Sequence, residues 1–289
     1  MTTGPVAPWW DTFRSGYDFD SHFDDDEHRR RALLHYHALC SFADANLGRI
    51  LDALDDSGLA DSTNVIFLSD HGDNMGARGL WGKSTMYRES VNVPLILAGP
   101  GIAGGRVCNT PVSLIDMQAS ALDAFALGLP VPREFTSRSL WRIARAPAAT
   151  DRPVFCEYHA SCARSALYMI REGRFKYIHY TGFGCELFDL KDDPGERHDL
   201  SGDPRHATIV TLLEARLRAV LVPEAVDARA KADQRARAAE LGGMAAIVAK
   251  GGVPHTPAPS APPFKARSKI VLESCSDRPW PPMKTDTRP

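Results

Sequence analysis

Two short apolar runs constrain the fold of this chain most strongly: "NVIFLSD" begins at residue 64 and "VPLILAGPG" at residue 93. Both are apolar on consecutive residues, so we expect central parallel strands with both faces buried. A helix is predicted over residues 26–57, where apolar residues recur at three- and four-residue intervals, and Gly58 follows as a stop signal. A second helix, predicted over residues 112–128, would pack back on the sheet. This alternation of helix and strand predicts an α/β fold.

The second half of the chain has a different pattern. From Pro153 the short runs "PVFCEYHA", "ALYMIREGRFKYIHYT" and "CELFDL" are separated by turn residues, which predicts an antiparallel meander. A helix is expected over residues 207–221, followed by an exposed helix rich in Ala and Arg. Residues 1–26 are expected to be irregular, and the Pro-rich stretch beyond Gly251 is expected to be an irregular tail.

Composition excludes several classes of function. A formal charge of -2 over 289 residues gives no basic field for nucleic acid. No run approaches the ~18 apolar residues of a membrane span, and no basic segment followed by an apolar one indicates a signal peptide, so the expected location is the cytoplasm. The six cysteines lack the Cys-x-x-Cys spacing of a zinc site, which favours buried thiols.

Asp70 and His71 stand directly after the first apolar run, where the side chains that bind ligands in open α/β sheets gather. A carboxylate suits Ca²⁺, Mg²⁺ or Mn²⁺, and a neutral imidazole adds a nitrogen ligand. Gly72 permits the turn that presents both side chains. The alternative is structural, with Asp70 capping a turn and His71 hydrogen-bonded in the core.

Lys83 lies in "GLWGKSTMYRES", where Gly79 and Gly82 allow a close backbone approach. Its ammonium group would bind a tetrahedral oxyanion such as sulfate or phosphate. The alternative is a solvated surface lysine. Trp81 either lines a substrate pocket or packs as an ordinary side chain.

Other candidate residues have weaker support. His159 and His179 stand on strand-like runs, where a structural, hydrogen-bonded role is the main alternative to a catalytic one. Cys156, Cys162 and Cys185 could cluster across the meander, but no ligand spacing accompanies them.

The motifs resemble the sulfatases of the alkaline-phosphatase-like superfamily. In order, the chain carries the "SDHG" turn, "GK", "YRES", "VPLI" and "PG" between residues 69 and 101. The lead-in "FADANLGRILDALDDSG" and the later "ELFDLKDDPGERHDL" are also similar to that family, so the resemblance covers residues 26 to 250.

The resemblance implies an alkaline-phosphatase-like sandwich, with part of a central mixed sheet, helices on both faces and a small C-terminal antiparallel subdomain. It divides the chain into a core carrying the metal and anion site (1–150), a C-terminal sulfatase subdomain (151–250) and the tail (251–289). It implies that Asp70 and His71 bind a divalent metal, taken as Ca²⁺ with Mn²⁺ or Mg²⁺ as alternatives, and that Lys83 holds the sulfate oxygens.

The sulfatase nucleophile is a formylglycine made from a Cys-x-Pro-x-Arg segment, and no cysteine of this chain stands in one. The chain therefore resembles the second half of a sulfatase, and we expect negligible hydrolysis by it alone. Three hypotheses follow: a sulfuric ester hydrolase acting on a small-molecule sulfate ester, a phosphonate or phosphodiester hydrolase of the same superfamily, and an inactive remnant or subunit. In the last case the partner would be an N-terminal sulfatase half or another copy in an oligomer.

Overall fold

The computed structural model describes residues 4–16, 20–125, 137–160 and 163–250. The chain separates into two compact units, with the boundary between Gln234 and Arg235. The three-part division predicted from the sequence stays a prediction.

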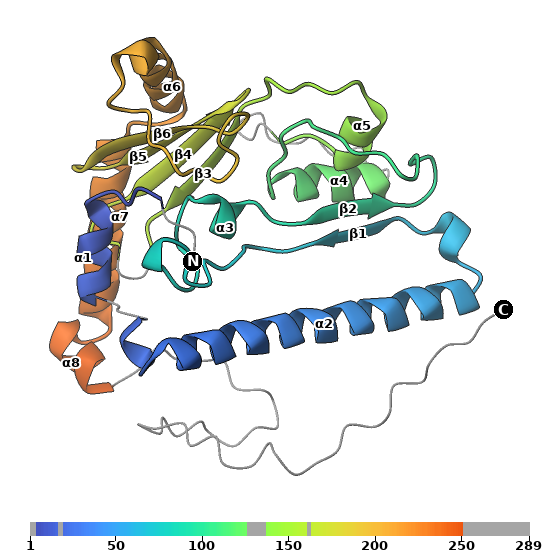
Figure 1. Cartoon of the computed structure of the whole chain (residues 1–289), viewed down its shortest axis with the longest axis horizontal. Coiled ribbons are helices and arrows are strands. Elements are labelled where there is room, and N and C mark those ends of the chain that lie inside the picture. Colours follow the sequence, from blue (N-terminus) through green and yellow to red (C-terminus); the bar gives the residue numbers. More distant parts are fainter. Residues whose placement is uncertain (1–3, 17–19, 126–136, 161–162, 251–289) are drawn as a thin grey trace. The chain divides into compact units, whose positions relative to one another are not determined.

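The long helix α2 runs from Asp26 to Asp56, as predicted (Figure 1). The Asp25 side chain caps its first turn by accepting a hydrogen bond from the His28 amide at 2.7 Å. At the other end Gly58 has φ +69°, a conformation that favours glycine and ends the helix. No side chain of α2 is buried in the described part of the chain.

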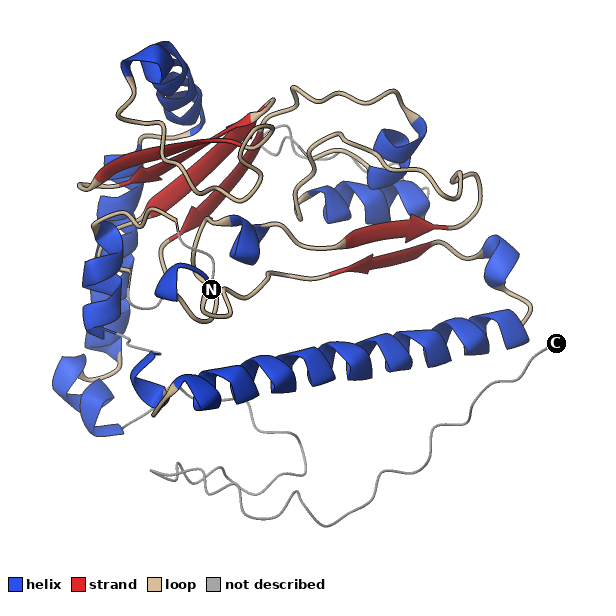
Figure 2. Ribbon diagram, viewed as in Figure 1, coloured by secondary structure: helices blue, strands red, loops and turns tan. Residues whose placement is uncertain are grey.

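The two apolar runs form strands β1 (Val65–Leu68) and β2 (Leu95–Ala98), which pair with each other in a separate two-stranded sheet (Figure 2). The pairing is antiparallel, so the prediction of parallel strands was wrong. The prediction that both faces are buried was also wrong, because Phe67 is 37% exposed and Ile96 is 60% exposed. An apolar run has the same appearance in either strand direction, so the sequence could not settle the pairing.

Two helices follow β2. Helix α4 (Asp116–Ala124) lies within the predicted helical segment, whereas α5 (Leu140–Arg145) was not predicted. The buried Asp116 carboxylate accepts two hydrogen bonds from the Arg152 guanidinium, at 2.7 and 2.8 Å. This fork-to-fork ion pair ties the start of α4 to the segment that leads into the second sheet.

The predicted meander is confirmed as a four-stranded antiparallel sheet in the order β3-β4-β5-β6. Its strands are β3 (Val154–Tyr158), β4 (Leu167–Glu172), β5 (Phe175–Tyr180) and β6 (Gly184–Asp189). Because side chains alternate across a strand, each face builds its own core. Tyr168 and Tyr177 pack with Leu213 and Leu217 of helix α6 (Ala207–Val220).

The opposite face of this sheet is covered by α1 (Trp9–Gly16), together with residues near the β1–β2 loop. Trp9, Trp10 and Phe13 are all buried there, against Tyr180 and Phe188 among others. The expectation that residues 1–26 are irregular was therefore wrong for this segment. Eight residues that carry two tryptophans are too short for a clear helical period, and the helix is held by packing.

The remaining elements are short or lie toward the C-terminus. Short 3₁₀ turns η1 (Asp20–His22), η2 (Ala60–Ser62), η3 (Ala77–Gly79) and η4 (Pro204–His206), and the single-turn helix α3 (Arg88–Val91), occur between the main elements. Helix α7 (Pro223–Glu240) is the polar helix predicted there, and α8 (Gly243–Lys250) follows it.

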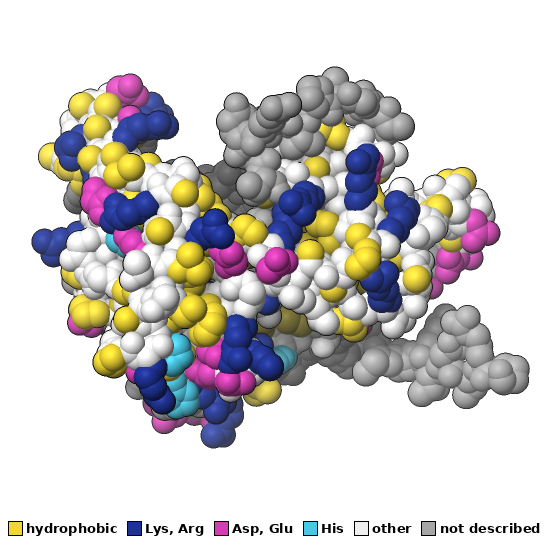
Figure 3. Space-filling model, turned by 90° about the horizontal axis from the view of Figure 1, so that it is seen from above, with side chains coloured by type: hydrophobic (Ala, Val, Ile, Leu, Met, Phe, Trp, Pro, Cys, Tyr) yellow, Lys and Arg dark blue, Asp and Glu magenta, His cyan; other side chains and the backbone are white. Residues whose placement is uncertain are grey.

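The described surface is mixed in character. Acidic and basic side chains are both scattered over the face shown in Figure 3, in keeping with the formal charge of -2. No helix among the described residues has the length and apolar character to cross a bilayer. The Pro-rich tail predicted beyond Gly251 lies outside the described residues.

Candidate metal and anion site

Asp70 and His71 begin the loop that follows β1, as the sequence indicated. The Asp70 carboxylate accepts a hydrogen bond from the His71 amide at 3.0 Å, and the Ser69 hydroxyl donates to the His71 carbonyl at 2.8 Å. The Gly72 amide donates to the Ser90 carbonyl at 2.7 Å. A Cβ on Gly72 would lie 2.0 Å from the Glu89 carbonyl oxygen, so only glycine fits. This contact presses the loop against α3.

The tautomer of His71 follows from its hydrogen bonds. Nδ1 lies 2.8 Å from the Gly72 carbonyl, which can only accept, so Nδ1 carries the proton. Nε2 is therefore left with a lone pair, which is the form that binds a metal. Asp70 Oδ2 lies 3.4 Å from the same Nε2, and the Asp70 side chain is 83% exposed.

Lys83 joins this pair, twelve residues further along the chain. Its Nζ lies 2.7 Å from His71 Nε2 and donates a hydrogen bond to it. The structure thus brings together all three residues that the sequence singled out for the site. Asp70 and His71 offer lone pairs that could bind a cation, and Lys83 offers N–H groups that could bind an anion.

The donor set fits part of a metal coordination shell. Asp70 and His71 supply one oxygen and one nitrogen, whereas Ca²⁺ takes six to eight ligands. Among the described residues no group of three or more His, Cys, Asp or Glu side chains is arranged to hold a metal ion. A metal at this position therefore requires further ligands besides this pair.

The loop between the metal pair and the lysine is closed by a buried amide. The backbone and side-chain amides of Asn74 both donate to the Gly82 carbonyl, at 2.7 and 2.6 Å. The Asn74 side-chain oxygen accepts from the Thr85 hydroxyl at 3.1 Å. Asn74 was not predicted from the sequence, because a lone polar residue in a loop carries no spacing signal.

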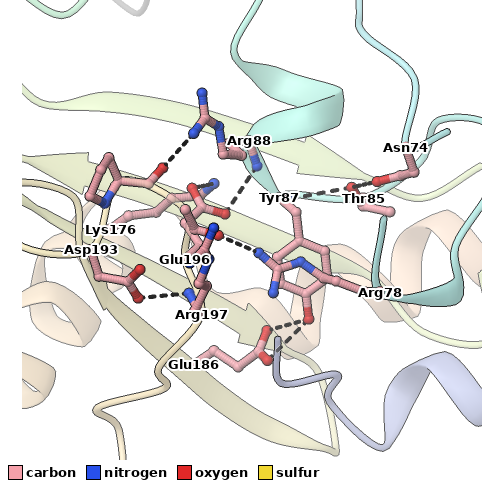
Figure 4. Close-up of polar contacts among 12 residues, drawn as sticks. Asn74, Arg78, Thr85, Tyr87, Arg88, Lys176, Glu186, Asp193, Glu196 and Arg197 are labelled. Carbon is pink, nitrogen blue, oxygen red and sulfur yellow. Dashed lines mark hydrogen bonds and ion pairs between the residues drawn. The ribbon is translucent and has the colours of Figure 1, made fainter. Parts of the chain in front are cut away.

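The middle of the same loop contacts Tyr87 and the segment that follows β6 (Figure 4). The Arg78 guanidinium lies 4.3 Å from the centre of the Tyr87 ring and donates to the Gly195 carbonyl at 3.0 Å. The backbone amide of Arg88 donates to Glu196 at 3.0 Å. Arg78 has φ +56°, an unfavourable conformation for a residue with a side chain, so packing holds it there.

Two buried carboxylates receive hydrogen bonds in this region. Glu196 pairs with Lys176 at 2.7 Å, and burial lowers the pKa of Lys176. Glu186 accepts hydrogen bonds from the hydroxyls of Tyr87 and Tyr180. Burial raises the pKa of Glu186 to about 7. Gly195 and Glu196 of the "DPGE" segment thus accept the hydrogen bonds that hold Arg78 and Arg88. The sequence did not indicate this role.

The other sequence candidates have partners of their own. The Trp81 indole donates to Asp20 at 3.0 Å, and its ring lies 4.4 Å from that of Phe23. His159 lies 3.0 Å from Glu157, and His179 lies 3.3 Å from Glu214 of α6. These contacts fit the structural alternatives given for each residue.

Cys156 and Cys185 lie on strands β3 and β6 of the four-stranded sheet. Burial raises the pKa of both Cys156 and Cys185, which disfavours the reactive thiolate, and Cys162 lies outside the described residues.

Comparison with known proteins agrees with the motifs and the fold. The sulfatase family model matches residues 7–127, and the model for the C-terminal part of N-sulphoglucosamine sulphohydrolase matches residues 76–222, just over half of the chain. The chain belongs to the sulfatase family. The choline-sulfatase of Rhizobium meliloti is 38% identical over 181 residues, which are 62% of this chain and 35% of that protein.

Solved structures extend the similarity to the fold. A putative sulfatase from Bacteroides thetaiotaomicron is 27% identical with a TM-score of 0.64, over 80% of this chain and 50% of that one. The phosphonate monoester hydrolase of Agrobacterium radiobacter is 28% identical with a TM-score of 0.53, over 61% of this chain and 38% of that one. The fold is thus the α/β fold of the sulfatases, and the chain spans about a third of the length of the curated relatives it matches.

Proposed function

We propose that this chain supplies the metal- and anion-binding part of a sulfatase active site, and that the completed site hydrolyses a small-molecule sulfate ester. The observation that carries the proposal is the convergence on His71 Nε2, where Lys83 Nζ lies at 2.7 Å and Asp70 Oδ2 at 3.4 Å. A cation bound between Asp70 and His71 would take the Nε2 lone pair in place of the Lys83 hydrogen bond, and the ammonium group would then be free to bind a tetrahedral oxyanion beside it.

Each residue has a distinct role in this proposal. Asp70 and His71 would provide two ligands of a divalent metal, Ca²⁺ by preference. The bound metal would withdraw charge from the sulfate oxygens. Lys83 would bind an equatorial sulfate oxygen and stabilise the negative charge that builds up as the ester bond breaks. The exposed position of Lys83 leaves it accessible to a substrate.

The nucleophile and the remaining metal ligands would come from a nucleophile-bearing sulfatase half. Support comes from the surface of α2, where Leu39, Phe42 and Ile50 are between 63% and 65% exposed. Strand β1 also has a single partner in the described sheet, which leaves its other edge open. A 31-residue helix with an apolar face suits burial against further α/β structure.

The test is a chimera in which this chain replaces the matched segment of the Rhizobium choline-sulfatase. We expect hydrolysis of choline sulfate or an aryl sulfate by the chimera and none above background by the chain alone. Lys83→Ala should lower kcat/KM at least 100-fold, because one oxyanion donor is lost. Lys191→Ala changes an exposed lysine and is the matched control.

The same experiment separates the alternatives. The phosphonate monoester hydrolase shares this fold, so a phosphonate ester and a phosphodiester are assayed beside the sulfate esters. A faster rate on either would favour that reaction class. A folded chimera that turns over none of these substrates would favour an inactive remnant.

A further inference from the structure

We propose that Asn74 is a positioning residue for Lys83. This inference rests on the proposed function, since it gives Lys83 the role of anion ligand. Asn74 grips the chain on both sides of the lysine: its side-chain Nδ2 donates to the carbonyl of Gly82, and its Oδ1 accepts from the hydroxyl of Thr85. Only Lys83 and Ser84 lie between these two contacts.

The segment that Asn74 holds is conformationally unfavourable by itself. Gly82 has φ +70° and Ser84 has φ +83°. Glycine adopts such angles readily, but serine rarely does. The bend at Ser84 therefore depends on contacts outside its own backbone. The two Asn74 hydrogen bonds, here called the clamp, lie on either side of this residue.

A carboxamide is the side chain that this position requires. Asn74 is 2% exposed and Thr85 is 3% exposed, so solvent cannot readily replace a lost partner. The Gly82 carbonyl needs a donor and the Thr85 hydroxyl needs an acceptor, and a carboxamide offers both at once. An aspartate in its place would direct a carboxylate oxygen at the Gly82 carbonyl, 2.6 Å away in the native contact.

The consequence for the site is geometric. With Ser84 held in this conformation, Lys83 Nζ lies 2.7 Å from His71 Nε2. With the clamp removed, Ser84 can relax to a favourable φ, which redirects the chain beside Lys83 and withdraws its ammonium group from the metal pair.

The experiment uses NMR on the isotope-labelled full chain, with two readouts. The first is the NOE between the Lys83 side chain and the His71 ring, which needs no ligand. The second is the affinity for inorganic sulfate, followed at the Lys83 amide. We expect Asn74→Ala and Asn74→Asp to abolish the NOE and to weaken sulfate binding at least tenfold, whereas Asn109→Ala, at an exposed asparagine, changes neither.

Rescue distinguishes positioning from a general loss of structure. In the Asn74→Ala background, Ser84→Gly should restore the NOE and most of the sulfate affinity, because glycine adopts φ +83° without help. If Asn74→Ala fails to fold, Thr85→Val removes the other half of the clamp and should still weaken the NOE. Unchanged NOE and affinity in the folded variants would overturn the proposal. A wild-type chain that shows the NOE but binds no sulfate would count against the proposed function alone.

Discussion

Glu186 is the residue whose ionisation should control stability near neutral pH. Burial raises its pKa from 4.5 to about 7, so the folded state binds a proton more tightly than the unfolded chain does. Folding is therefore favoured most below pH 4.5, and this contribution is lost as the pH rises from 4.5 to about 7. The contribution is on the order of 3 kcal/mol.

Glu186→Gln should remove this part of the pH dependence. We expect the free energy of unfolding in urea to fall between pH 5 and pH 7.5 for the wild type and to change less for the variant. Glu27→Gln, on the exposed start of α2, serves as the control and should retain the wild-type slope. Equal slopes for the wild type and Glu186→Gln would show that Glu186 does not carry the effect.

At the scale of single residues, the sequence predicted a set of chemical groups but not the contacts that support them. Asp70, His71 and Lys83 were predicted as site residues because they stand in ordered motifs with glycines around them, and the structure places the three close together. Arg78 could not be found in this way, because its partner Gly195 is 117 residues away. Such contacts depend on the tertiary arrangement, which a local pattern does not contain.

At the scale of elements, periodicity predicted α2, α4, α6 and the meander, since each has a repeating apolar pattern long enough to identify. It failed for α1, whose eight residues are stabilised by what they pack against. It also failed for the direction of β1 and β2, because strand direction depends on how the two runs are connected in space.

Helix α1 should act as a major anchor of the four-stranded sheet. Trp9 is fully buried, its ring lies 6.0 Å from that of Tyr180, and its indole donates to the Ser165 carbonyl at 3.0 Å. Trp9→Ala should lower the free energy of unfolding by about 3–5 kcal/mol, through lost burial and a residual cavity. Phe125→Ala removes a side chain that is 74% exposed and should cost less than about 0.5 kcal/mol. Similar losses for the two variants in urea denaturation would contradict this role for α1.

For the whole molecule, the most informative surface is that of α2, where the apolar side chains of Leu39, Phe42 and Ile50 are 63–65% exposed. Exposed apolar patches of this kind promote association. We expect the purified chain to self-associate with rising concentration in analytical ultracentrifugation. The triple change of Leu39, Phe42 and Ile50 to glutamine should reduce this association and keep the helix, because glutamine is a good helix former.

The same variant tests what the surface is for. If α2 docks the nucleophile-bearing sulfatase half, the three glutamines should lower the activity of the chimera even though they improve the solubility of the isolated chain. A general loss of structure would lower both the activity of the chimera and the solubility of the isolated chain. It would therefore not explain a loss of activity together with a gain in solubility. An active chimera carrying all three glutamines would place the docking surface elsewhere, and the open edge of β1 would then be the next segment to test.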